Sequence, residues 1–155
     1  MKYRQLTKEQ FESLHEEFAH FLASQQIDAN EWKQLKKEKP AVVTEEMDVF
    51  SDIVWEDVLT KTNYLEHFSA TAINLFKCDA DEIYRIAIKV NTEINLLEEA
   101  GFTWLMNNIN DESVTIFSGK KKYTADRNPE IFDLIEKGNT ISKGILFEHY
   151  SKLIS

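Results

Sequence analysis

Three consecutive lysines follow a glycine in the segment FSGKKKYT, residues 117–124, of a chain whose formal net charge is −9. Lysine and arginine side chains suit phosphate, because their cationic groups donate charge-assisted hydrogen bonds to phosphate oxygens. A helix is expected to begin near Asn128, and its free backbone N–H groups would attract an anion as well. The segment therefore predicts a candidate anion site, made of Lys120, Lys121, Lys122 and Arg127.

A nucleoside-triphosphate loop is excluded at this position. The pattern G-x-x-x-x-G-K-[ST] needs glycine at 114 and Ser or Thr at 121, whereas this chain has Val114 and Lys121. The alternative to an anion site is a solvated turn, in which Gly119 lets the backbone reverse direction. The lysines would then hydrate the turn and discourage edge-to-edge strand pairing. We expect the turn, and keep the anion site as the second interpretation.

A row of carboxylates lies in a segment expected to be helical from about Thr44 to Leu59. The carboxylates recur at spacings of three and four, which places them on one stripe of the helix: Glu45, Asp48, Asp52 and Glu56. Like charges at this spacing repel, so we expect a compensating group. Either the lysines of the preceding helix supply it (Lys33, Lys36 and Lys37), or a basic protein partner does. We call these four carboxylates the acidic stripe; it is either a solvated face or a candidate partner-binding surface.

The histidines near the start of the chain do not predict a metal centre. Glu12-x-x-His15 and Glu17-x-x-His20 have the spacing used in carboxylate-bridged di-metal bundles, but such bundles take the two motifs from different helices. Here both motifs lie on one helix, with the histidines five residues apart. At that spacing the two imidazoles point about 140° apart. We interpret them as surface histidines.

The only cysteine, Cys78, precedes an acidic turn that contains Asp79, Asp81 and Glu82. The calcium-loop pattern fails here, because it requires a glycine that is missing. Cys78 can in principle pair with a histidine, yet a lone cysteine in a hairpin is more often a packing residue. No G-x-S-x-G elbow is present either. We therefore expect no catalytic machinery, no metal site and no cofactor.

The first part of the chain has the spacing of helices. Thr7 and Gln10 form a capping box before an apolar stripe, and a second box starts at Asp28. Pro40 ends the second helix, and the third helix is apolar around most of its circumference. After about residue 70 the pattern changes to strands at 72–78, 83–90, 113–117 and 145–150, with helices at 96–108 and 128–137.

This order predicts an α+β fold in which three N-terminal helices precede a ββαβαβ half with a small mixed or antiparallel sheet. We expect a single domain over residues 1–155, helical in 1–69 and sheet-containing in 70–155. No apolar stretch approaches the ~20 residues of a membrane span, and no signal-peptide pattern opens the chain, so we expect a cytoplasmic protein. The acidic charge balance argues against general nucleic-acid binding, although residues 113–155 carry 7 basic and 5 acidic side chains.

Four stretches together resemble a family of short bacterial proteins catalogued as a domain of unknown function. They are the opening MKYRQLTKEQF, FSDIVWEDVLTK (50–61), the INLFKCD hairpin, and the run from TIFSGKKKYT to NPEIFDLIEKG. The resemblance spans nearly the whole chain and implies no functional residue. From the residues themselves we expect a small protein–protein interaction module that uses the acidic stripe. The alternative is a phosphate- or nucleotide-binding protein that uses Lys120–Lys122.

Overall fold

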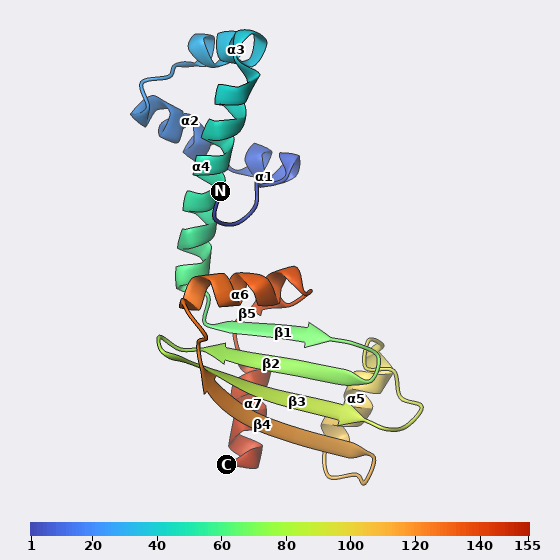
Figure 1. The fold of residues 1–155 in the computed structure, drawn as a ribbon. Helices are drawn as coiled ribbons and strands as arrows, with labels where there is room; N and C mark the ends of the chain where they lie inside the picture. The colour runs from blue at the N-terminus through green and yellow to red at the C-terminus, as the bar shows by residue number, and fades with distance from the viewer. The chain divides into compact units, whose positions relative to one another are not determined.

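The computed structural model describes all residues, Met1–Ser155, and contains seven helices and one five-stranded sheet (Figure 1). The α+β class and the leading position of the helices are as predicted. The chain forms two compact units, Met1–Thr60 and Lys61–Ser155. The single-domain organisation expected over 1–155 stays a prediction. None of the helices combines the length and the apolar character that a membrane span requires.

The first unit is helical. It contains α1 (Lys8–Ser13), α2 (His15–Ser24), α3 (Ala29–Glu38) and α4, which begins at Pro40 and runs to Lys61. The predicted capping box is present: Thr7 accepts from the Gln10 N–H, and the Gln10 side chain accepts from the Thr7 N–H. The first predicted helix is two helices, because the backbone leaves helical geometry at Leu14 (φ −106°, ψ 25°). Asp28 caps α3 as expected, accepting from the Glu31 N–H.

Aromatic rings pack α1 and α2 against α4. Phe50 of α4 is buried and contacts Phe11, Phe18 and Phe21, with ring centroids 4.9–6.0 Å apart. Trp32 of α3 meets the Phe18 ring edge-on, at 5.4 Å. Aromatic pairs add specific edge and face contacts to the burial of apolar area. The phenylalanines of the predicted apolar stripe therefore form the core of this unit.

The second unit is an antiparallel sheet with strand order β4-β3-β2-β1-β5. The predicted hairpin is β2 (Ala72–Cys78) and β3 (Glu82–Val90), followed by the predicted helix α5 (Glu99–Asn107). Residues missed as strands form β1 (Tyr64–Phe68), so the range 1–69 is not entirely helical. The sheet is completed by β4 (Val114–Lys122) and β5 (Thr140–Ser142), and the remaining helices are α6 (Arg127–Glu136) and α7 (Ile145–Ile154).

The prediction of a last strand at 145–150 is wrong, because these residues open α7. Phe147 and Tyr150 lie three positions apart on this helix and are both buried, as a helical period requires. Gly144 precedes them in the left-handed region (φ 82°), where glycine is favoured. The α6 prediction was nearly right: its N-cap is Asp126 rather than Asn128, and Gly138 (φ 109°) follows its end.

The main core of this unit lies on one face of the sheet, under α5 and α7. Its buried residues are Ile73, Leu75, Ile86, Ile88, Val90, Leu96, Leu105, Phe147 and Tyr150. Side chains alternate between the two faces along a strand. The residues between these positions, including Phe76, Arg85, Ala87 and Lys89, therefore lie on the opposite face, where α6 packs.

Candidate ligand-binding groove

The three lysines of the predicted turn lie on a strand. Lys120, Lys121 and Lys122 belong to β4 and pair with Tyr84, Ile83 and Glu82 of β3. The prediction that the backbone reverses at Gly119 is therefore wrong. Because side chains alternate along a strand, Lys121 shares a face with Gly119, whereas Lys120 and Lys122 alternate to the other face. The three amines do not converge on one point.

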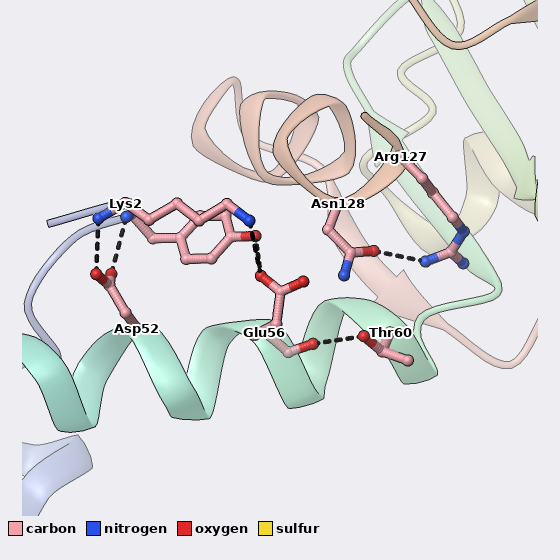
Figure 2. Close-up of polar contacts among 7 residues, drawn as sticks. Lys2, Asp52, Glu56, Thr60, Arg127 and Asn128 are labelled. Carbon is pink, nitrogen blue, oxygen red and sulfur yellow. Dashed lines mark hydrogen bonds and ion pairs between the residues drawn. The ribbon is translucent and has the colours of Figure 1, made fainter. Parts of the chain in front are cut away.

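Arg127 lies at the start of α6, where its guanidinium is hydrogen-bonded to main-chain carbonyl groups. Its guanidinium donates to the main-chain carbonyls of Asp79 (3.0 Å), Cys78 (3.1 Å) and Thr62, and to the side chain of Asn128 (2.8 Å; Figure 2). These hydrogen bonds join the start of α6 to Thr62, two residues before β1, and to the β2–β3 turn. Of the four predicted anion-site residues, Lys121 and Lys120 border the groove described next, and Arg127 and Lys122 line a neighbouring hollow.

A groove of 910 Å³ lies between α6 and the β3–β4 half of the sheet. The sheet contributes two aromatic rings, Phe76 and Phe117, and two small residues, Ala87 opposite Phe117 and Gly119 two residues further along β4. The helix contributes one face with the spacing i, i+3, i+4, i+7: Glu130, Asp133, Leu134 and Lys137. A side chain at Gly119 would meet no atom within 4 Å, so the floor of the groove is open there. We call this feature the β3–β4 groove.

The β3–β4 groove is basic, although the chain is acidic. Four basic residues on its side of the sheet and of α6 border it (Arg85, Lys89, Lys121 and Lys137), with two acidic ones (Glu130 and Asp133); Lys120 also borders it, but alternates to the other face of β4. Two of the cations sit against the two aromatic rings of the floor. Arg85 lies 5.9 Å from the Phe76 ring centroid, and Lys89 lies 5.4 Å from that of Phe117. Cation–π contact of this kind holds a cation beside a ring without neutralising its charge.

Arg85 is also oriented by a hydrogen-bonding neighbour. Its Nε and Nη2 atoms donate to Oδ1 of Asn74, at 3.1 and 2.6 Å. The Arg85 side chain is nevertheless exposed, as is Phe117, which keeps 52% of its surface accessible. An oriented guanidinium and an exposed ring at the same groove are the elements of a binding site rather than of a core.

An ion pair joins the strand to the helix across the groove. Lys121 Nζ lies 3.0 Å from Oε2 of Glu130, and the other Glu130 oxygen accepts from the Thr124 N–H at 2.9 Å. Partial burial opposes ionisation of Glu130, but these hydrogen bonds and the lysine charge outweigh it and lower its pKa. Lys121 is thus held at the groove by a carboxylate that an anionic ligand would compete with.

Three carboxylates of the acidic stripe contact the start of the same chain, and Figure 2 shows two of them, Asp52 and Glu56. Asp52 accepts from the backbone N–H groups of Lys2 (2.6 Å) and Tyr3 (2.9 Å). Glu56 accepts from the Tyr3 hydroxyl and from Lys2 Nζ, and Asp48 accepts from the Gln5 amide at 2.9 Å. The compensating groups therefore come from residues 2–5 rather than from the lysines of α3. Partner binding by Glu45, Asp48, Asp52 and Glu56 stays a prediction, and it would require this segment to move.

Two further residues considered in the sequence analysis are His15 and Cys78. His15, at the start of α2, contacts the carbonyl oxygen of Glu12, near the end of α1, at 3.0 Å. Cys78 is buried in β2, and burial raises the pKa of its thiol to about 11, so the thiolate is disfavoured at neutral pH. No group of three or more His, Cys, Asp or Glu side chains is placed to hold a metal ion.

A second, more apolar hollow of 720 Å³ lies beside β5, between α5 and the start of α7. It includes two very exposed aliphatic side chains, Leu97 (62% accessible) and Ile145 (75% accessible). Carboxylates outnumber cations around it: Glu66, Glu98 and Glu99 against Lys143. We call it the β5 hollow.

Sequence reasoning missed the residues that make the β3–β4 groove. Arg85 and Lys89 interrupt the branched apolar run IYRIAIKV and are four residues apart, so on a strand both lie on the same face. This spacing was the available signal for a polar sheet face. Their proximity to Phe76 and Phe117 depends on the strand order and register, which the sequence does not show.

Comparisons with known proteins bear on the whole chain. No curated protein and no solved structure gives a significant match. One family model does match, and it covers residues 1–155, the full length. The chain belongs to the Family of unknown function (DUF6495), as the resemblance of its four stretches predicted.

Proposed function

We propose that this protein binds a phosphate-bearing aromatic ligand of the nucleotide class in the β3–β4 groove. The observation that carries the proposal is the composition of the groove: four basic residues on the groove side (Arg85, Lys89, Lys121 and Lys137) and two aromatic rings border it, in a chain of net charge −9. A groove with an apolar floor and a few convergent polar groups is the usual form of a small-molecule site. The lysine cluster singled out in the sequence contributes through Lys121, because Lys120 and Lys122 alternate to the other face of the sheet.

Each kind of side chain has a role in this proposal. The exposed ring of Phe117, with Ala87 and Gly119 beside it, offers a flat apolar surface on which a base can stack. Arg85, oriented by Asn74, offers a planar donor group that suits phosphate oxygens. Lys121 would exchange its ion pair with Glu130 for one with the ligand.

The test is isothermal titration calorimetry with AMP, ADP, ATP and inorganic phosphate. We expect binding of the adenine nucleotides, weakened about tenfold or more by Phe117→Leu, in keeping with the stacking energy of a base on an aromatic ring. Arg85→Gln should weaken all the phosphorylated compounds. The matched control is Lys152→Gln, an exposed charge on α7 away from the groove residues. Absence of binding by every compound at millimolar concentration would overturn the proposal.

Protein binding is a second candidate function, favoured by the β5 hollow. Its exposed Leu97 and Ile145 suit an apolar segment, and its carboxylates suit basic residues flanking that segment. We therefore expect a partner peptide with an apolar centre and Lys or Arg on either side. That the protein acts in the cytoplasm stays a prediction as well.

Selection from a random peptide library would test this second candidate. Enriched peptides should share apolar residues flanked by Lys or Arg, and Leu97→Asp and Ile145→Asp should each abolish their binding. The control is Phe117→Asp, which changes another exposed apolar residue, outside the hollow. Enrichment of acidic peptides, or binding unaffected by the two substitutions, would contradict this function.

A further inference from the structure

We propose, on the basis of the proposed function, that the ligand of the β3–β4 groove is of dinucleotide size, with two bases and more than one phosphate. The β-sheet register places the groove residues in rows. Lys89 pairs with Thr115, Ala87 with Phe117, Arg85 with Gly119, and Ile83 with Lys121. The cations Lys89, Arg85 and Lys121 thus occupy three different rows of the same face.

The rows extend over a length greater than one nucleotide needs. From the row of Lys89 to the row of Lys121 the strand advances six residues, or about 20 Å at the usual rise per residue. A base stacked on Phe117 lies two residues from Lys89 and four residues from Lys121, roughly 7 and 13 Å along the strand. A nucleoside monophosphate carries its only phosphate directly on its own sugar, so it can contact the cations at one end of the groove at a time.

A second aromatic ring, the half-buried Phe76, borders the same groove and would stack a second base if the ligand displaced Arg85 from it. Phe76 lies on β2, in the row of Arg85, and Phe117 lies on β4, in the row of Ala87. The rings are therefore two strands apart, roughly 10 Å across the sheet, with Arg85 and Ala87 between them. Two rings flanking a guanidinium match two bases flanking a phosphodiester, in which Arg85 contacts the linking phosphate.

The net charge of the unit that contains the groove disfavours binding of a longer polyanion. The unit that contains the groove, Lys61–Ser155, has 11 basic and 14 acidic side chains, a net charge of −3. Asp133 and Glu130 on α6 border the groove itself. A phosphate that extends beyond the groove would meet this negative field, and in the neighbouring hollow the carboxylates of Asp79, Asp81, Glu82 and Asp126 outnumber the cations Lys122 and Arg127. We therefore infer an affinity maximum at two nucleotides rather than a steady rise with length.

The experiment titrates the full-length protein with adenine nucleotides of increasing length: AMP, the 5′-phosphorylated dinucleotide pApA, and the corresponding tetranucleotide and decanucleotide. The dinucleotide should bind about tenfold more tightly than AMP, the gain expected from a second base–aromatic stack. The tetranucleotide and decanucleotide should bind no more tightly than pApA. Phe76→Leu should remove the gain of pApA and leave AMP binding unchanged, whereas Phe117→Leu should weaken both. Leucine keeps most of the side-chain volume, so these variants preserve the packing of β2 and β4.

The outcomes separate this inference from the proposed function. If AMP binds and pApA binds no better, the dinucleotide inference fails and the proposed function stands. If the decanucleotide binds most tightly and its affinity falls steeply with salt, the ligand is single-stranded nucleic acid and the inference is overturned. If no compound of the series binds, both proposals fail. Exposed Ile141→Ala is the matched control variant, because Ile141 lies on β5 and not in the groove.

Discussion

Lys121 on β4 and Glu130 on α6 form an ion pair, with 3.0 Å between Nζ and Oε2, at the border of the β3–β4 groove. The pair joins the edge strand to the helix that walls the groove. It also places a negative charge next to the cation that a ligand would use. Its removal is expected to affect stability and ligand binding in opposite directions.

The first prediction is that Glu130→Gln strengthens nucleotide binding. The substitution releases Lys121 and removes a negative charge from the groove, so AMP should bind about threefold to tenfold more tightly at low salt. Calorimetric titration measures the change. Asp57→Asn is the control, because it removes an exposed carboxylate from α4, outside the groove. Weaker binding by Glu130→Gln would show that Glu130 itself contacts the ligand.

The second prediction concerns pH and the same carboxylate. The pKa of Glu130 is lowered in the folded protein from its ordinary value of 4.5, so its ionised form stabilises the fold. This contribution is fully present above pH 4.5 and is lost as the pH falls through the lowered pKa. The stability difference between wild type and Glu130→Gln, measured by urea denaturation, should therefore be constant from pH 6 to 8 and shrink toward pH 3. A stability difference that grows as the pH falls would contradict the lowered pKa of Glu130.

The third prediction is that Asp52 stabilises the helical unit through the N-terminal segment. Asp52→Ala removes the acceptor of two backbone N–H groups, and we expect a loss of about 1–2 kcal/mol, since hydrogen bonds to charged groups exceed neutral ones. Glu45→Ala, on the exposed end of the same stripe, should change stability by less than about 0.5 kcal/mol. Chemical denaturation of both variants measures this. Equal effects would mean that the segment contributes nothing beyond charge.

The fourth prediction compares two glycines. A Cβ at Gly144 would lie 2.5 Å from the Tyr64 ring, and its φ of 82° disfavours any other residue, so Gly144→Ala should cost about 2–4 kcal/mol. Gly119→Ala meets open space on a strand and should be neutral or stabilising by up to about 1 kcal/mol. Thermal denaturation monitored by circular dichroism separates them. Equal destabilisation would place the Gly119 side-chain position in a packed environment.

The fifth prediction is that Cys78 resists thiol reagents. Its side chain is 2% exposed and its thiol pKa is about 11, so both access and ionisation are unfavourable at neutral pH. Reaction with a chromogenic disulfide at pH 7.5 should be more than about tenfold slower in buffer than in strong denaturant. Fast modification of the native protein would point to an opening of the sheet near β2.

Sequence reasoning identified most elements because their signals are local. The Thr7 capping box, the Asp28 cap, and the β2–β3 hairpin depend on neighbouring residues only, and all three are confirmed. The strand prediction for residues 145–150 failed because a six-residue, largely apolar run fits the period of a strand and that of a helix. The buried pair Phe147 and Tyr150 has the helical spacing. Tertiary packing determined the outcome.

The turn predicted at Gly119 and the three lysines was wrong for a different reason. Glycine and three like charges indicate a turn when only the segment is considered. The strand continues because β3 supplies a partner for every residue of β4, including Glu82 opposite Lys122. The same pairing brings Arg85 and Phe117 into one groove. A site assembled from three strands by register leaves no compact motif in the sequence.

The contact between Asp52 and the N-terminal segment has an evolutionary consequence. Because the carboxylate accepts from main-chain N–H groups, its bonds to residues 2 and 3 are indifferent to which side chains those positions carry. Proline is the exception, since it has no N–H to donate. The Asp52 contact therefore excludes only proline at positions 2 and 3, whereas selection on the side chains at these positions acts through Glu56, which accepts from Lys2 Nζ and the Tyr3 hydroxyl.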